Sequence, residues 1–297
     1  MKQLVVLTPA YNRSYSLKAL FESLCRQTCL DFEWWVVDDG STDNTKQAVE
    51  QFSVQTPFPI RYMYKENGGK HTALNVAIPQ IESELTIIVD SDDTLTNDAV
   101  ETIYRYHNKY AAYPGLCGYV FHRRFSDGSI SGKWFEPDEQ IASYIDMRIN
   151  GDDTHADKAE VFCTRCLQEF PFPEYPGEKF LSEDVVWLQM GRKYQMVHIN
   201  KAIYQFEYLG DGLTKNRRQY NIASPQGCMH RAALYMEKNI KLRYRLKGAL
   251  QYLIYGRFAG YGFGELLTLT RYKLLAAVLT VPAALLYAVW RRSYDGQ

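Results

Sequence analysis

Short apolar runs and amphipathic segments alternate through about the first 90 residues of the chain. Each run has the length of a strand that is buried on both faces. Between the runs, apolar side chains recur at the spacing of a helix packed on a sheet, as at Leu17, Leu20 and Leu24. This alternation predicts an α/β fold with a doubly wound, mostly parallel sheet. The predicted strands are 3–8, 33–37, 60–64 and 85–89.

A polar stretch follows each predicted strand. Because the carboxyl ends of parallel strands meet at one edge of a sheet, the four stretches should lie together. Each stretch alone also reads as an ordinary turn or helix start, and it is their convergence that favours a binding site. They contain Thr8, Pro9, Ala10, Tyr11 and Arg13; Asp38, Asp39 and Gly40; Gly68, Gly69 and Lys70; and Asp90, Ser91, Asp92 and Asp93.

The side chains of these stretches suit a nucleotide. Tyr11 and Arg13 can stack on a base and hydrogen-bond to it, and Asp39 can accept a hydrogen bond from a base N–H. Lys70, at a predicted helix start, can meet an anionic group. The chain has neither G-x-G-x-x-G after its first strand nor a Walker lysine motif, which argues against a dehydrogenase or a P-loop kinase.

Three carboxylates, Asp90, Asp92 and Asp93, directly follow the fourth strand. Such closely spaced anions repel one another unless a cation compensates them, and oxygen-only ligands suit Mg²⁺ or Mn²⁺. We therefore expect a metal site here. The alternative is a solvated acidic turn, in which Asp93 or Asn97 caps the next helix.

Residues 117–210 contain a further pair of acidic residues that could do chemistry. Within them, Glu183 and Asp184 stand at the start of an amphipathic helix. A carboxylate placed in this way can remove a proton from an attacking hydroxyl group. Alternatively, Ser182 caps the helix and the two carboxylates favour its positive end.

The order of the four motifs resembles that of family 2 glycosyltransferases with the GT-A fold, over about the first 215 residues. The resemblance implies that Asp92 ends a D-x-D element and holds the divalent ion that bridges the donor's two phosphates. It assigns Asp39 to the base, the first loop to the nucleoside, and Asp90 to the ribose or the metal shell. It also makes Asp184 the base of an inverting transfer. The motifs are Thr8-Pro9-Ala10-Tyr11-Asn12, Val36-Val37-Asp38-Asp39-Gly40-Ser41-Thr42-Asp43, Gly69-Lys70 and Asp90-Ser91-Asp92-Asp93.

The zero net charge of the chain hides an asymmetry. Residues 1–216 hold 21 Lys and Arg against 31 Asp and Glu, whereas residues 217–297 hold 13 against 3. A basic, aromatic tail after an acidic domain suggests an anionic partner such as membrane headgroups.

The six cysteines show no paired framework, so we expect reduced thiols. No signal peptide is apparent, and we expect the main domain to face the cytoplasm.

The tail contains a basic helical stretch, 229–257, and then 17 uncharged residues, 274–290, with cations on both sides. A spanning helix needs about 20 apolar residues, and flanking cations at both ends favour a segment that lies in the cytoplasmic leaflet. The alternatives are a single span, or a buried helix that packs on the catalytic domain or mediates dimerisation. A lipid surface explains both cations and apolar run, so we expect no nucleic-acid binding.

Two glycines and several cations at 210–218 suggest a lid. Lys215 and Arg217 could close over a diphosphate, although a plain surface linker would have the same composition.

We thus predict a catalytic domain, 1–216, and a membrane-associating helical region, 217–297. Within the catalytic domain, residues 1–116 bind the nucleotide and 117–216 form the acceptor half and lid. The predicted protein is a peripheral or monotopic bacterial enzyme of polysaccharide biosynthesis. It would transfer a sugar from a nucleotide-diphosphate donor, a UDP-sugar, to a lipid-linked or growing saccharide. A catalytically silent nucleotide-sugar binder or membrane scaffold is the alternative.

Overall fold

The computed structural model describes residues 3–151, 156–206 and 217–294. The chain forms two compact units, and each is described by itself. The first unit comprises Met1–Pro171 and Gln189–Tyr208, and the second comprises Phe172–Leu188 and Leu209–Gln297. The functional division at residue 216 stays a prediction.

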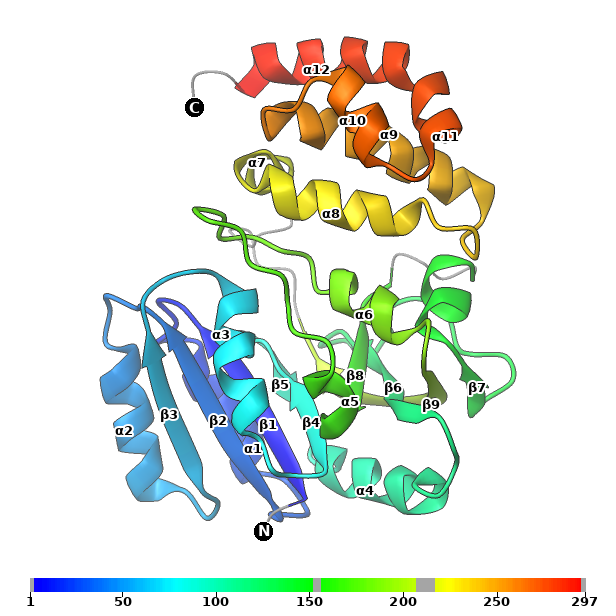
Figure 1. Cartoon of the computed structure of the whole chain (residues 1–297). Helices are drawn as coiled ribbons and strands as arrows, with labels where there is room; N and C mark the ends of the chain where they lie inside the picture. The colour runs from blue at the N-terminus through cyan, green and yellow to red at the C-terminus, as the bar shows by residue number, and fades with distance from the viewer. Residues whose placement is uncertain (1–2, 152–155, 207–216, 295–297) are drawn as a thin grey trace. The chain divides into compact units, whose positions relative to one another are not determined.

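A single sheet runs through the first unit. Its order is β3-β2-β1-β4-β8-β6-β9-β5, with β7 paired to β9. The strands β1 to β4 are parallel, which confirms the predicted α/β fold (Figure 1). In the other half, β8 is antiparallel to both β4 and β6. The strands are β1 (Leu4–Ala10), β2 (Phe32–Asp39), β3 (Ile60–Lys65), β4 (Leu85–Ile88), β5 (Thr94–Leu95), β6 (Leu116–Arg124), β7 (Gln140–Ala142), β8 (Lys158–Cys163) and β9 (Gln195–Gln205).

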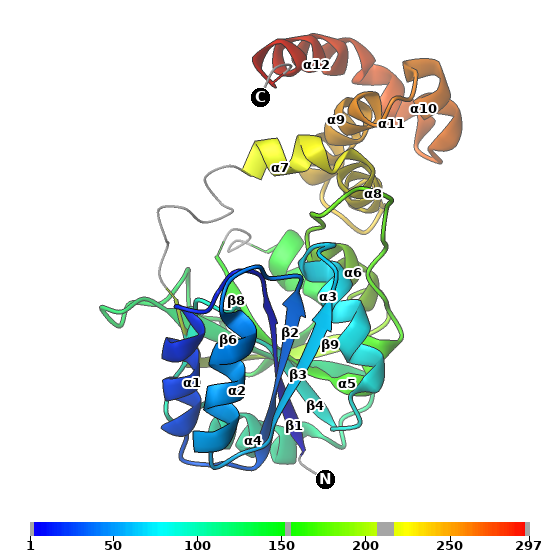
Figure 2. The ribbon, with the colours of Figure 1, turned by 90° about the vertical axis from the view of Figure 1, so that its left-hand side faces the viewer.

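Helices cover both faces of this sheet. The helices α1 and α2 lie on one face of the β1–β3 region and α3 lies on the other (Figure 2). Phe21, Trp34 and Phe52 stack between α1, α2 and β2, with ring centroids 4.3 to 6.2 Å apart. The helices are α1 (Leu17–Cys25), α2 (Thr45–Gln55), α3 (Lys70–Ala77), α4 (Ala99–Tyr110) and α5 (Thr164–Gln168), with short helical turns at Ile78–Gln80 and Ile145–Ile149.

The second unit is helical. Its core lies along α9, whose Ala249 and Leu253 are fully buried and pack with Ala276 and Ala283 of the last two helices (Figure 1). α6 (Asp184–Met190) begins in this unit and ends in the first. The other helices are α7 (Arg217–Ala223), α8 (Pro225–Tyr235), α9 (Leu242–Phe258), α10 (Phe263–Leu269), α11 (Lys273–Val278) and α12 (Thr280–Tyr294).

The apolar run 274–290 is divided between two helices, α11 and α12. Pro282 therefore does not kink a continuous helix. It stands in the first turn of α12, where its missing N–H is no loss. Over the described residues, we find no helix whose length and apolar content would let it span a bilayer. All six cysteines are free thiols in this structure.

Gly118 provides a test of how closely β6 and β8 approach. A Cβ atom at Gly118 would lie 2.0 Å from the Val161 carbonyl oxygen, whereas one at Gly128 would meet nothing within 4 Å. Both glycines have positive φ, 153° and 85°. We expect Gly118→Ala to destabilise the fold by about 3 kcal/mol, and the control Gly128→Ala by about 1 kcal/mol. Thermal unfolding measures both, and equal losses would contradict the close approach.

Candidate active site

Hydrogen bonds join the first two loops at the carboxyl edge of the sheet. The Asn12 backbone N–H donates to Ser41 Oγ at 2.8 Å, and Asn12 Oδ1 accepts from the Thr42 N–H at 2.8 Å. Asn12 has a φ of 53°, a left-handed conformation that Asn tolerates. The two polar stretches are thus one connected structure, with Tyr11 half exposed beside them.

Thr8, Pro9 and Ala10 belong to β1, which extends two residues further than expected. All three are buried, and Thr8 Oγ1 accepts a hydrogen bond from the Trp34 indole at 3.0 Å. The Thr8 hydroxyl is therefore already hydrogen-bonded within the core of the first unit. Tyr11 and Arg13 are the more accessible side chains of this stretch.

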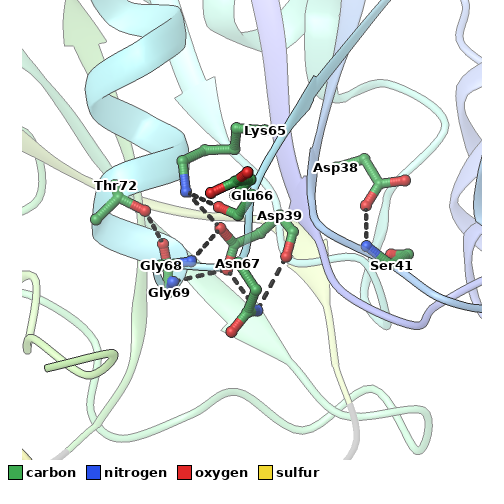
Figure 3. A network of polar contacts seen from close by, with 9 residues as sticks. All are labelled: Asp38, Asp39, Ser41, Lys65, Glu66, Asn67, Gly68, Gly69 and Thr72. Atoms are coloured by element: carbon green, nitrogen blue, oxygen red, sulfur yellow. Dashed lines mark hydrogen bonds and ion pairs between the residues drawn. The ribbon is translucent and has the colours of Figure 1, made fainter. Parts of the chain in front are cut away.

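The buried carboxylate of Asp39 holds the next loop (Figure 3). Its Oδ1 accepts from Lys65 Nζ at 2.8 Å and from the Gly68 N–H at 2.9 Å. Its Oδ2 accepts from the Gly69 N–H at 2.7 Å and from Asn67 Nδ2 at 3.1 Å. Four donors around one carboxylate fix the conformation of residues 65–69, which lead into α3.

Gly40 permits this arrangement. It has a φ of 78°, and a Cβ atom there would lie 2.6 Å from the Asn67 backbone nitrogen. The neighbouring Asp38 is also buried, and its carboxylate accepts from the Ser41 N–H at 2.7 Å and the Tyr62 hydroxyl at 2.6 Å. Lys65, Asn67 and Tyr62 were not predicted as partners of the two aspartates.

At the end of β4, two of the three carboxylates are compensated by cations. Lys70 forms an ion pair with Asp90. Arg123 NH1 lies 3.9 Å from Asp90 Oδ2 and 3.6 Å from Asp93 Oδ2, and its guanidinium stacks 4.1 Å from the centre of the Tyr204 ring. The Tyr204 hydroxyl donates to Asp93 at 2.8 Å. Arg123 and Tyr204 were not predicted.

The pKa values of these carboxyls move in opposite directions. Burial disfavours the charged form of Asp90, but Lys70 and Arg123 outweigh burial and lower its pKa. Burial and the negative charge of Asp90 raise the pKa of Asp93 to about 7. Asp93 therefore carries a proton for part of the time near neutral pH.

Asp92 differs from its two neighbours. Its side chain is partly exposed and makes no hydrogen bond or ion pair with any other residue that the structure describes. Across those residues no three His, Cys, Asp or Glu side chains are grouped to bind a metal. Mg²⁺ typically uses one or two carboxylates together with substrate phosphates and water, so a single free carboxylate at this edge fits such an ion.

Asp184 lies in the second unit as the first residue of α6. Arg231 Nε donates to both of its oxygens, at 2.6 and 2.8 Å, and Arg231 NH2 donates to Oδ2. The Tyr235 hydroxyl also donates to Oδ2, at 2.8 Å. Burial would raise the pKa of Asp184, but the charge of Arg231 outweighs it and lowers that pKa. Glu183 precedes the helix, and the Ser182 side chain also donates to Asp184. This arrangement is consistent both with a cap at the start of α6 and with Asp184 as a general base.

The expected lid falls mainly outside the described residues. Residues 207–216, with Lys215, are among those that the structure does not describe. Arg217 begins α7 with an exposed side chain. Arg218 stacks on Trp290, 4.6 Å from the ring centre.

Two curated relatives are similar to large parts of the chain. Glycosyltransferase GlyG of Streptococcus pneumoniae is 32% identical over 158 residues, which are 51% of this chain and 52% of GlyG. GalNAc(5)-diNAcBac-PP-undecaprenol beta-1,3-glucosyltransferase of Campylobacter jejuni is 27% identical over 226 residues, 73% of this chain and 70% of the relative. The chain thus spans about half the length of GlyG, and it matches less than a fifth of two further relatives, Glycosyltransferase GlyA of Streptococcus pneumoniae and TarS of Staphylococcus aureus.

Solved structures share the fold. TarS 1–349 of S. aureus in complex with UDP-GlcNAc aligns with a TM-score of 0.58 and 18% identity, over 99% of this chain and 91% of that one. The mannosyltransferase PcManGT from Pyrobaculum calidifontis, in complex with GDP-Man and Mn²⁺, aligns with the same score and identity over 99% and 84%. At this identity the likeness shows the GT-A fold alone.

The family model named Glycosyl transferase family 2 matches residues 5–153, half of the chain. This range contains β1 to β4, the Asp39 loop and the three carboxylates after β4. The match confirms the resemblance seen in the motifs. The chain belongs to glycosyl transferase family 2.

Proposed function

We propose that this protein is an inverting, metal-dependent glycosyltransferase. It transfers a sugar from a nucleotide-diphosphate donor, a UDP-sugar, to a lipid-linked or growing saccharide in polysaccharide biosynthesis. The observation that carries the proposal is Asp92, an uncompensated carboxylate at the sheet edge beside two carboxylates that Lys70 and Arg123 compensate. Relatives named as glycosyltransferases, one of them for an undecaprenol-linked substrate, support it.

The donor's nucleoside would lie along the first two loops. Tyr11 and Arg13 are accessible there for stacking and hydrogen bonding. Asp39 remains the proposed partner of the base, and because its oxygens already accept four hydrogen bonds, much of its contribution would be to shape the loop. The UDP-GlcNAc complex of TarS supports a uridine donor.

The donor's diphosphate would lie near the end of β4. Asp92 would hold Mn²⁺ or Mg²⁺, with Asp90, Ser91 and Asp93 around it, and Mn²⁺ in the PcManGT complex supports this cofactor. When bound, the ion neutralises charge on the departing diphosphate. Lys70 adds a further cation at this place, and Lys215 and Arg217 are proposed to contact the diphosphate.

Transfer would be a single displacement. The acceptor oxygen attacks the anomeric carbon while the bond from that carbon to the phosphate oxygen breaks. The hydroxyl proton passes to the Asp184 carboxylate, with Glu183 beside it, and the nucleoside diphosphate leaves with the bonding electrons. Attack from the side opposite the leaving group inverts the anomeric centre.

The outer face of α11 and α12 supports membrane attachment. One face of these helices packs on α9, and the other is apolar as well as exposed. A helix that is apolar on both sides needs a cover. We name this surface the α11–α12 face; its members, by exposed fraction, are Leu274 (86%), Val278 (76%), Val281 (70%), Leu285 (66%) and Val289 (58%).

The cations next to this face indicate what covers it. Arg271 and Lys273 precede it, Arg291 and Arg292 follow it, and all four are exposed. Apolar side chains with cations at both ends match the interface of an anionic leaflet. We propose that residues 229–292 attach the protein to the cytoplasmic face of the membrane in a peripheral or monotopic manner, close to a lipid-linked acceptor.

Donor binding can be tested by thermal shift with UDP, GDP, ADP and CMP, each with Mn²⁺ and with chelator. We expect UDP with metal at about 100 times its dissociation constant to stabilise the fold by about 2.7 kcal/mol. Asp92→Asn should lose the metal-dependent part of this shift, because it removes the free carboxylate. The control Asp127→Asn changes an exposed turn and should keep it. No shift with any nucleotide would contradict the donor site.

Turnover separates an enzyme from a silent binder. We expect Asp184→Asn to lower UDP release from a UDP-sugar by about 100-fold or more, because an amide cannot accept the hydroxyl proton. The metal-dependent UDP thermal shift should persist, which shows that the variant is folded. Full turnover in this variant would refute Asp184 as base, and absence of turnover in the unmodified protein with every UDP-sugar would favour the scaffold alternative.

Flotation with lipid vesicles tests the α11–α12 face. We expect binding to phosphatidylcholine vesicles that contain phosphatidylglycerol and weaker binding without it. Leu285→Gln with Val289→Gln should weaken binding by about 10-fold or more, because each removes apolar area from the interface. The control Val54→Gln alters an apolar residue of α2 that is even more exposed, at 88%, and should bind normally. The membrane proposal would be wrong if the unmodified protein does not bind vesicles but forms a dimer that the double variant disrupts. The α11–α12 face would then be an interface with a second copy of the chain.

A further inference from the structure

Arg231 and Tyr235 of α8 lie around Asp184, the proposed base, and neither has a part in the transfer step as proposed. They are one helical turn apart, so their side chains reach the same carboxylate. The Arg231 NH2 group also donates to the Tyr235 hydroxyl at 3.1 Å. Arginine, tyrosine and aspartate thus form a closed triangle within the second unit.

The rest of α8 is tied to the segment that carries Asp184. The carboxylate of Glu178 accepts from the backbone N–H groups of Gln226 and Gly227, at 2.7 and 2.8 Å. Ser224 Oγ accepts from the Phe180 N–H at 3.1 Å. Together with a 2.6 Å hydrogen bond between Tyr175 and His230, these contacts hold residues 175–184 against residues 224–235.

The distribution of donors on Asp184 is uneven. Oδ2 accepts from Arg231 Nε at 2.8 Å, from Arg231 Nη2 and from Tyr235, whereas Oδ1 accepts from Arg231 Nε at 2.6 Å. The Ser182 side chain is a further donor to this carboxylate. Donors on one oxygen fix the plane of the carboxylate and direct a new hydrogen-bond partner to the other. A base held in this way needs little reorganisation when an acceptor arrives.

We propose that Arg231 and Tyr235 are positioning residues for Asp184, which keep its carboxylate ionised and direct Oδ1 toward the acceptor hydroxyl. This inference rests on the proposed function, because it assumes that Asp184 is the base. It makes α8, and not only the loop before α6, part of the transfer machinery.

The charges near Asp184 agree with this role. Arg231 faces it from α8. Further titratable groups in this surrounding are Cys228 of the same helix, Glu178 of the segment before α6, and Arg217 of α7. Burial and the charge of Asp184 raise the pKa of Tyr235, which therefore stays a donor at neutral pH. Burial raises the pKa of the Cys228 thiol, and the charges of Glu178 and, to a smaller extent, Asp184 add to this effect. Arg231 is the cation that compensates Asp184 directly.

The pH dependence of UDP release tests the proposal. The assay uses the UDP-sugar that is cleaved fastest, with water as acceptor, and compares Tyr235→Phe and Arg231→Gln with the unmodified protein. Arg231 and Tyr235 lower the pKa of Asp184, so the loss of either partner should raise that pKa. On acidification, each variant should therefore lose activity at a higher pH than the unmodified protein does. For Arg231→Gln we expect the acid limb to move up by about 1 to 3 pH units.

Tyr235→Phe keeps the experiment informative if Arg231→Gln does not fold, because it removes one hydroxyl and retains the ring. We expect its kcat to fall by about 10-fold and its acid limb to move in the same direction. The UDP thermal shift of either variant should be unchanged.

The possible outcomes separate the two proposals. If Asp184→Asn is inactive and the acid limbs move, both stand. If Asp184→Asn is inactive but both variants keep the acid limb of the unmodified protein, Arg231 and Tyr235 are merely structural and this inference is overturned. If Asp184→Asn is fully active, the assignment of the base fails, and the inference fails with it.

Discussion

The binding edge of the sheet depends on the carboxylate of Asp39. A buried anion without partners is strongly unfavourable, and here the backbone N–H groups of Gly68 and Gly69 provide half of its partners. These groups reach Asp39 only when the loop after β3 is folded over the end of β2. The same closure sets the start of α3, and so it places Lys70 beside Asp90. Asp39 in β2 thereby fixes the position of Lys70, which forms its ion pair at the end of β4.

The three carboxylates after β4 have different surroundings, and two of them have shifted pKa values. Asp90 is held ionised by its two cations, while Asp93 shares a proton with solvent near neutral pH. The repulsion that three adjacent anions would produce is thus relieved without a bound ion. Asp92 is left available for the proposed Mn²⁺ or Mg²⁺ ion.

The sequence was sufficient for the parts of the fold that depend on local patterns. Four parallel strands and their alternating helices follow from apolar periodicity, and the motifs after them led to the correct family. The expectation of burial on both faces is wrong for β3, because it lies at the edge of the sheet and is only partly buried. Partners that come from distant segments were missed. Arg123 and Tyr204 join Asp93 only because β6 and β9 end at the same edge. The pair Arg123 and Arg124, shortly after the apolar residues 119–121, was a signal in the sequence that could have been used. Arg231 could not be matched to Asp184 from spacing, because 47 positions separate them.

The position of β8 affects the order in which the protein can fold during synthesis. β4 is flanked by β1 on one side and by β8 on the other, and about 70 residues separate β4 from β8 in the chain. At roughly 5 to 20 residues per second, the ribosome needs about 4 to 14 seconds to make this interval. During that time the free side of a short, apolar strand exposes unpaired backbone groups, which is a recognised risk for aggregation. The nascent chain thus has a period of vulnerability that ends when Lys158–Cys163 emerges and the two halves of the sheet close.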